Sequence, residues 1–400
     1  ASTPPPTPVP PSGSPSPFPT ALHTPTRSVV APKLTSPSAV LLDLDSRQVL
    51  YAKKANVRRP IASITKIMTA LVVLEASSTD ETVVVSPRAA GTSGSQLGLV
   101  VGERISVRHL LYAILMQSSN DAAVALAEHV AGSVPAFVDA MNRRARELGL
   151  DRTSFQDPAG LDDRGYSTAN DVADLVGEAY SHPLFARITR TKFHRIPAPS
   201  GPTRRIQNRN ILLWLYPGAI GAKTGFTTPA QHCLVAAADR EGNRRVAVAL
   251  GSPGDDAGGA FDDGAALLNF GFEGFQKVVL VAKGQSLARV MVEGQPVEAI
   301  AGDQLVRLVR KDQLTRILRA FLSDNGLFLP LVAGQRVGKT LVLIAGKRVG
   351  SVEAVAARTV FRAAPAPSLS PSEGPGGVGS LAAALRLLAV LIRSLFGGFL

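Results

Sequence analysis

Residues 63–76 read SITKIMTALVVLEA. A helix with this sequence is apolar on nearly every side, and such a helix is buried inside a domain. A lysine in those surroundings is energetically costly unless it has a partner. Lys66 comes one turn after Ser63, so its amine can approach the serine hydroxyl and, once deprotonated, act as its base. The stretch therefore predicts a central buried helix that carries a nucleophile.

The surrounding pattern predicts strands before and after a helical region. A β-hairpin is expected at 38–51, because two apolar runs flank a Ser-Arg-Gln turn. Further helices are expected at 107–130, 134–148 and 170–179, and a second hairpin at 233–250. A helical insertion between early and late strands indicates an antiparallel sheet backed by helices, in the α+β class.

Changes in composition divide the chain into five segments. They are a proline-rich tether at 1–28, a main domain at 29–275, a small β-rich domain at 276–363, a linker rich in Pro, Gly and Ser at 364–379, and an apolar tail at 380–400. The chain begins at Ala1 instead of methionine, which suits a mature form whose secretory signal has been removed. We therefore expect an exported protein.

The apolar tail carries Arg386 and Arg393. On a helix about 30 Å long these arginines share one face. Because an arginine inside a spanning helix costs roughly 2.5 to 3.5 kcal/mol, we expect the tail to lie in the outer surface of the cytoplasmic membrane with both arginines toward the headgroups. A true span is the second interpretation, and a core or oligomerisation helix is the third.

Composition limits the classes of protein that the chain can belong to. Its 400 residues are 45% hydrophobic and 18% charged, which excludes a largely disordered chain and a polytopic membrane protein. The net charge of +12 indicates attraction to polyanions, but the basic residues are scattered and no nucleic-acid partner is expected. The single cysteine, Cys233, is expected to be a small core residue. The six histidines lack ligand spacing, so we expect no metal and no cofactor.

Two further motifs follow Ser63-x-x-Lys66 along the chain. Residues 118–120 supply a Ser-x-Asn, and residues 223–225 supply Lys-Thr-Gly directly before a strand. A Ser-x-x-Lys alone is weak evidence, since on the order of one chance match is expected and a capping serine with a snorkelling lysine would explain it. The three motifs in this order match the set of class A β-lactamases and penicillin-binding proteins.

The residue types indicate a role for each motif position. Ser118 can relay a proton to a leaving amine, and Asn120 can orient Lys66 and the acyl part of a substrate. A substrate carboxylate would find a positive charge at Lys223 and a hydroxyl at Thr224. Two ammonium groups about 5 Å apart at an effective dielectric near 20 repel by roughly 3 kcal/mol, or about two pKa units, which favours a neutral Lys66.

The Lys-Thr-Gly motif and the residue after it are also expected to contribute to the oxyanion hole. Gly225 permits a close approach of the backbone. The backbone N–H groups of Ser63 and Phe226 are the expected donors to the oxyanion.

The sequence resembles the low-molecular-mass penicillin-binding D-alanyl-D-alanine carboxypeptidases of peptidase family S11. The similar stretches are AVLLD at 39–43, ASITKIMTA at 62–70, SNDAA at 119–123, DPAGL at 157–161, YSTA at 166–169, KTGFT at 223–227 and LLNFGF at 267–272. The β-rich domain and the tail are also similar to those of that family. The resemblance implies a penicillin-recognising serine transferase fold, with an antiparallel sheet and a helical subdomain, followed by a small β-sandwich domain.

The same resemblance implies an activity. It is the removal of the terminal D-alanine from peptidoglycan pentapeptide stems through an acyl-enzyme on Ser63, with Lys66 as base, Ser118 and Asn120 as relay and orienter, and Lys223 to Phe226 as the substrate-binding strand. β-Lactams are expected to trap the same serine.

Several positions depart from the family pattern. Ser119 replaces a usual glycine, Ala159 a usual histidine, and Gln231-His232 a usual Gly-aromatic pair. Ala260 stands where the resemblance leads us to expect an arginine near the substrate carboxylate. The alternatives are therefore a penicillin-sensing or wall-binding protein with poor turnover, a D,D-endopeptidase or a weak β-lactamase.

Two further expectations concern charged and aromatic residues near the end of the main domain. The neighbouring Asp262 and Asp263 are expected to be solvated charges. For His232 the first interpretation is structural packing, and contact with a substrate is the second.

Overall fold

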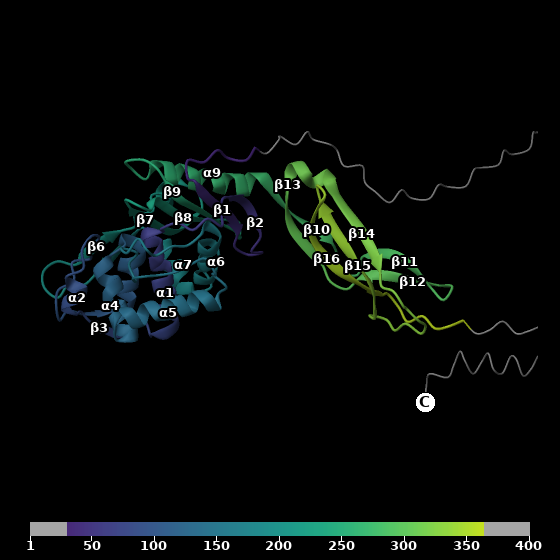
Figure 1. Cartoon of the computed structure of the whole chain (residues 1–400), viewed down its shortest axis with the longest axis horizontal. Coiled ribbons are helices and arrows are strands. Elements are labelled where there is room, and N and C mark those ends of the chain that lie inside the picture. The colour runs from purple at the N-terminus through teal and green to yellow at the C-terminus, as the bar shows by residue number, and fades with distance from the viewer. Residues whose placement is uncertain (1–29, 364–400) are drawn as a thin grey trace, which may run out of the picture.

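The computed structural model describes residues 30–363. They form a larger domain of helices and sheet followed by a slender β domain (Figure 1). The predicted tether at 1–28 and the predicted linker and tail at 364–400 lie outside these residues. Within residues 30–363 we find no helix with both the length and the apolar character that crossing a bilayer requires.

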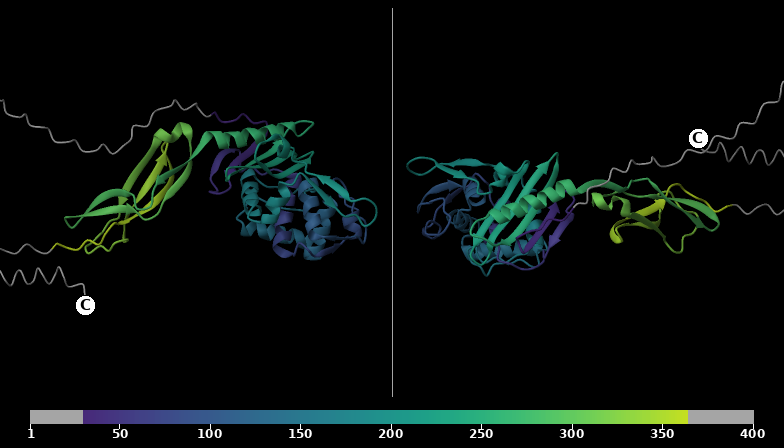
Figure 2. Two further views of the ribbon diagram at one scale, coloured as in Figure 1. Left: turned by 180° about the vertical axis from the view of Figure 1, so that it is seen from behind. Right: turned by 90° about the horizontal axis from the view of Figure 1, so that it is seen from above.

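A five-stranded antiparallel sheet forms the centre of the larger domain, in the order β2-β1-β9-β8-β7. The strands are β1 (Ser38–Asp43), β2 (Val49–Lys53), β7 (Ala219–Thr227), β8 (Gln231–Arg240) and β9 (Asn243–Ser252). Helix α9 (Gly258–Gly274) covers one face and the helical subdomain covers the other (Figures 1 and 2). Both predicted hairpins are confirmed, and the sheet is buried on both faces.

The helical subdomain surrounds the predicted central helix. Its helical elements are the 3₁₀ turn Ala62–Thr65, α1 (Lys66–Ala76), α2 (Pro87–Ala90), α3 (Val107–Tyr112), the π turn Ala113–Gln117, α4 (Asn120–Ala131), α5 (Val134–Glu147), α6 (Ala169–Ala179), α7 (Pro183–Thr189) and α8 (Leu212–Leu215). Two short antiparallel strand pairs complete it: β3 (Thr82–Val84) with β4 (Arg104–Ser106), and β5 (Phe193–Ile196) with β6 (Arg204–Gln207). The first eight residues of α1 are buried. The prediction of a buried helix is confirmed, with Ser63 on the 3₁₀ turn that leads into it.

The continuous helix predicted for 107–130 is wrong. After α3 and the π turn, Ser118 has a φ of 68° in the left-handed region, and α4 begins only at Asn120. This backbone conformation is strained for a residue with a β-carbon, and it is kept only where the surrounding structure fixes it. The apolar residues continue with helical spacing on both sides of Ser118, so the sequence pattern gave no sign that the helix is interrupted there. The break places Ser118 at a corner between two helices.

The β domain is a small sandwich. The pair β10 (Phe275–Val281) and β13 (Leu305–Arg310) packs on a five-stranded sheet in the order β11-β12-β16-β15-β14. The sheet strands are β11 (Ser286–Val292), β12 (Gln295–Ala301), β14 (Ile317–Ser323), β15 (Arg336–Ile344) and β16 (Lys347–Ala356), and a 3₁₀ turn spans Lys311–Arg316. Apolar side chains from both sheets, among them Leu280, Leu305 and Val342, form its core.

The two domains are joined by more than the chain that connects α9 to β10. The side-chain amide of Gln48, in the β1–β2 hairpin, donates to the carbonyl of Leu308 at 2.7 Å and accepts from the Leu308 N–H at 3.0 Å. The Leu308 side chain is buried in the core between α9 and the five-stranded sheet of the larger domain. Gln48 thus pairs with β13 as a neighbouring strand would.

The expectation that Asp262 and Asp263 are both solvated is wrong for Asp263. Its side chain on α9 is buried, with 3% of the residue exposed. The carboxylate accepts hydrogen bonds from the Thr35 N–H, the Thr35 hydroxyl and the Ser36 N–H at 3.0, 2.9 and 2.7 Å. It therefore ties the segment before β1 to α9, whereas Asp262 is exposed.

This difference between two adjacent aspartates can be measured. We expect Asp263→Ala to lower the free energy of unfolding by about 1 to 3 kcal/mol, because the buried Ser36 N–H is left without its acceptor and Thr35 loses both of its contacts to α9. The matched control, Asp262→Ala, should change it by no more than about 0.5 kcal/mol. Urea unfolding of both variants is the measurement, and equal effects would contradict the role given to Asp263.

Candidate active site

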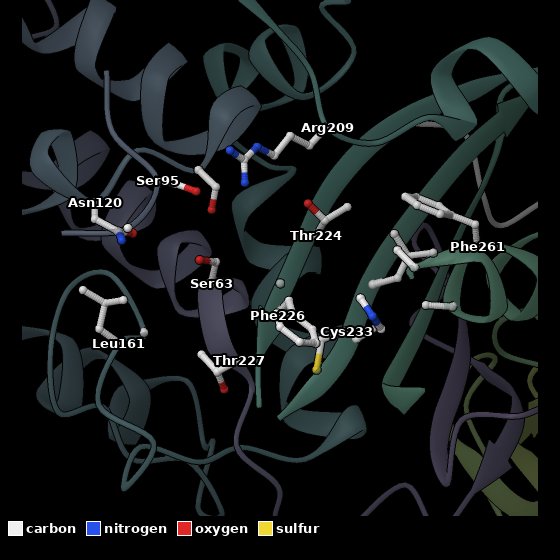
Figure 3. A pocket seen from close by; sticks show the side chains of 18 residues that line it. Ser63, Ser95, Asn120, Leu161, Arg209, Thr224, Phe226, Thr227, Cys233 and Phe261 are labelled. Atoms are coloured by element: carbon white, nitrogen blue, oxygen red, sulfur yellow. The ribbon is translucent and has the colours of Figure 1, made fainter. Parts of the chain in front are cut away.

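A cleft of about 440 Å³ opens beside β7 and brings together residues of all three motifs. Ser63, Ser118, Asn120 and Thr224 line it. Figure 3 shows Ser63 between Asn120 and Thr224, with Arg209 above them. The residues that the sequence placed in three separate motifs therefore meet at one cleft.

The backbone around Ser63 is tightly constrained. Ala62, directly before it, has a φ of 46° in the left-handed region. Gly160 passes so close that a β-carbon there would lie 2.0 Å from the Ala62 carbonyl oxygen, so only glycine fits. On the other side, a β-carbon on Gly225 would lie 3.1 Å from the Ser63 nitrogen. The turn that presents Ser63 is held between these two glycines.

Lys66 is fully buried, with an exposed fraction of 0%. Its Nζ lies 2.9 Å from Ser63 Oγ, 2.8 Å from Asn120 Oδ1 and 2.6 Å from the Ala159 carbonyl oxygen. Burial lowers the pKa of Lys66 to about 7, against the opposing effect of nearby Asp157. A neutral amine has two hydrogens and one lone pair; the two oxygens that can only accept take the hydrogens, which leaves the lone pair for the Ser63 hydroxyl.

The Ala159 carbonyl is fixed by a carboxylate-centred loop. Asp157 accepts the backbone N–H groups of Ala159, Gly160, Leu161 and Asp162 at 2.6 to 2.9 Å. Only the main chain of residue 159 contacts Lys66. An alanine in place of the family's usual histidine is therefore compatible with this contact.

Asn120 is oriented from its other end. Its Nδ2 donates to the Ser93 carbonyl at 2.8 Å, which turns Oδ1 toward Lys66. The loop that carries Ser93 is held by Asp121, whose carboxylate accepts the N–H groups of Leu97, Gly98 and Leu99 at 2.9 to 3.1 Å. Ser119, between the two motif residues Ser118 and Asn120, is buried, and its hydroxyl has no hydrogen-bond partner among residues 30–363.

Lys223 contacts the protein and does not line the cleft. It is 2% exposed, and its Nζ donates to Ser118 Oγ at 2.9 Å and to the Thr224 carbonyl at 2.7 Å. Burial lowers its pKa well below the usual value, and the charges of Lys66 and Arg209 lower it further. The expected repulsion between the two lysines thus acts on Lys223, whereas for Lys66 burial dominates and Arg209 is the contributing cation. Binding of a substrate carboxylate by Lys223 stays a prediction.

Arg209 is a cleft residue that the sequence analysis missed. It lies between two buried asparagines, and the Asn208 Oδ1 accepts the N–H of Asn210, closing the turn that presents it. Within residues 30–363 its guanidinium has no hydrogen-bond or ion-pair partner, and partial burial lowers its pKa. The sequence feature that could have identified Arg209 is its place between two asparagines, just before the apolar residues that lead to the strand of Lys223.

The β7 strand supplies the remaining predicted residues. Thr224 and Gly225 line the cleft, and Phe226 lies at its edge with 54% of its surface exposed. Its ring contacts that of His232 with centroids 4.5 Å apart. The oxyanion hole from the N–H groups of Ser63 and Phe226 stays a prediction.

Cys233 is buried in the core, as expected. Burial raises the pKa of its thiol to about 11, so it is not a nucleophile near neutral pH. No group of His, Cys, Asp or Glu in the described part of the chain is arranged to hold a metal ion.

Residues 25–254 match the family model of the D-alanyl-D-alanine carboxypeptidases. The chain belongs to this family. The D-alanyl-D-alanine carboxypeptidase DacF of Bacillus subtilis is 34% identical over 331 residues, which cover 80% of this chain and 84% of that protein. The membership confirms the resemblance and the serine carboxypeptidase class predicted from the motifs.

Solved structures of the carboxypeptidase family share the fold. Penicillin binding protein 5 from Haemophilus influenzae matches 84% of this chain and 100% of its own, with a TM-score of 0.69 and 29% identity. The carboxypeptidase DacD from Francisella tularensis matches 86% of this chain and 98% of its own, with a TM-score of 0.70 and 26% identity. These likenesses confirm the predicted fold class.

The pKa of Lys66 predicts how acylation depends on pH. Below pH 7 the amine is protonated and has no lone pair, so the second-order rate constant for labelling by fluorescent penicillin should fall about tenfold per pH unit and level off above about pH 8. Stopped labelling reactions between pH 5 and 9 are the measurement. A rate constant that stays flat from pH 5.5 to 8 would show that Lys66 is not the base.

Proposed function

We propose that the protein is a serine D-alanyl-D-alanine carboxypeptidase that removes the terminal D-alanine from pentapeptide stems of peptidoglycan. The observation that carries this proposal is the buried Lys66, whose two acceptor contacts leave its lone pair for Ser63. A neutral lysine in this position supplies the base that a serine needs to become a nucleophile near pH 7.

Acylation begins when Lys66 takes the proton of the Ser63 hydroxyl. The freed oxygen attacks the carbonyl of the penultimate D-alanine, and the N–H groups of Ser63 and Phe226 are proposed to stabilise the oxyanion. Ser118 gives its proton to the leaving amine and receives the proton that Lys66 took from Ser63, while Lys223 holds the Ser118 oxygen through its hydrogen bond. The amide bond breaks, D-alanine leaves, and the rest of the stem stays on Ser63 as an ester.

Deacylation repeats these steps with water as the nucleophile. Lys66, neutral again once its proton has passed to Ser118, takes a proton from the water and returns it to the Ser63 oxygen as the ester breaks, which restores the Ser63 hydroxyl. In a β-lactam the leaving nitrogen remains covalently attached to the acyl group after ring opening, so it cannot diffuse away. A long-lived penicilloyl ester on Ser63 follows from this difference.

Two side chains are proposed to bind the carboxylate of the leaving D-alanine. The Thr224 hydroxyl faces the cleft, and the Arg209 guanidinium supplies a charge there. Charge-assisted hydrogen bonds of a guanidinium to a carboxylate are among the strongest in proteins. Asn120 lies on the opposite side of Ser63 (Figure 3), where the acyl part of the substrate would lie.

The test measures D-alanine release from diacetyl-Lys-D-Ala-D-Ala together with labelling by fluorescent penicillin. The wild type should release D-alanine, and penicillin should block the release. We expect Ser63→Ala to reduce both signals by about 10³-fold or more, because the attacking oxygen is lost. Ser119→Ala, a buried serine outside the cleft, is the matched control and should keep both. Labelling that survives in Ser63→Ala would contradict the mechanism.

We also propose that the protein is exported and held at the outer face of the cytoplasmic membrane by the tail at 380–400. The support is the tail's apolar composition and the seven-residue spacing of Arg386 and Arg393, which would share one face if the tail formed a helix. Deleting residues 380–400 should release the protein from membranes in a sedimentation assay while a soluble peptide is still hydrolysed. Deleting residues 1–28 is the control and should leave the protein bound. A tail-deleted chain that still sediments with membranes would contradict the anchor.

A further inference from the structure

The catalytic cleft continues past Thr224 into a recess. Six residues surround this recess: Phe226, His232, Leu234, Ala257, Ala260 and Phe261. They come from β7, β8 and the start of α9. Figure 3 places Thr224 between Ser63 and Phe261, so the recess begins where the catalytic residues end.

The register of the sheet explains why these side chains meet. Thr224 is paired with Leu234, and Phe226 is paired with His232, across the β7–β8 ladder. Paired residues lie on the same face of a sheet, as do residues two apart on one strand. The four side chains therefore form one surface. Thr224 belongs to the catalytic cleft and also borders the recess.

The side chains that line the recess are mainly apolar. Leu234 and Ala260 are 1% and 2% exposed, and Phe261 and Ala257 extend the apolar wall. None of the six residues carries a fixed charge. The short side chain of Ala260 leaves open the space that a longer residue at this point of α9 would occupy.

The position of the recess indicates which part of a substrate reaches it, and this step rests on the proposed function. Ser118 serves the leaving amine and Thr224 the leaving carboxylate, so the leaving residue lies between them. Its side chain is then the group nearest to the recess. The methyl group of D-alanine is too short to fill it.

We propose that the recess is a binding subsite for an apolar side chain on the leaving residue, so that the enzyme also releases C-terminal D-amino acids larger than D-alanine, with D-leucine as the type case. The reaction is unchanged: the same amide bond breaks, the leaving amine receives one proton, and water hydrolyses the ester on Ser63. Each methylene buried in the recess should raise kcat/KM by about fourfold at most.

The test compares diacetyl-Lys-D-Ala-D-Leu with diacetyl-Lys-D-Ala-D-Ala, with the released amino acid measured by chromatography on the full chain. For the wild type we expect kcat/KM for the D-leucine peptide to equal or exceed that for the D-alanine peptide. Ala260→Leu should lower the ratio of the two values at least tenfold, because its side chain fills the recess. Ala266→Leu, on the same helix but outside the cleft, should leave the ratio within twofold.

Several outcomes would overturn the subsite. One is a wild type that releases D-alanine but cleaves the D-leucine peptide with less than a tenth of that efficiency; this leaves the carboxypeptidase proposal standing. Another is a folded Ala260→Leu with an unchanged ratio. If Ala260→Leu does not fold, Ala260→Val replaces it, and a ratio lowered less than threefold would overturn the subsite. Failure to release either amino acid would instead overturn the proposed function itself.

Discussion

The complete burial of the Lys66 amine is the constraint on which the catalytic domain depends. A carboxylate partner would satisfy the amine but would also keep it charged, and a charged amine cannot accept a proton. The partners are instead two neutral oxygens, from Ala159 and Asn120. They position the amine without fixing its proton, which keeps the pKa near 7.

The carboxylates near Lys66 have a different use. Asp157 and Asp121 each accept several backbone N–H groups from a loop that would otherwise have no regular hydrogen bonding. Both negative charges raise the pKa of Lys66, but the larger opposite effect of burial outweighs them. The same bonds hold the Ala159 carbonyl and the Asn120 amide in place before any substrate arrives, as catalysis by preorganised groups requires.

The sequence was informative where a short-range rule applied. Ser63 and Lys66 lie on one helical face because they are three residues apart, and the hairpins follow from alternating runs around turns. Ser118 was predicted as a site residue, yet its left-handed backbone interrupts a pattern that reads as one helix. Nothing in the spacing indicated that Lys223 points into the protein and toward Ser118, or that Arg209 enters the cleft. Asp263 was misjudged because its partners are more than 200 residues away. These features depend on contacts between segments far apart in the sequence, which local sequence patterns do not indicate.

The Gln48–Leu308 pair has a mechanical consequence. Two hydrogen bonds and a buried leucine act together at the junction, so the β domain cannot pivot without losing all three at once. The described chain leaves the β domain at the end away from the catalytic domain (Figure 1). The cleft is therefore held in one position and orientation relative to that exit. Without these contacts the cleft could take many positions relative to that exit.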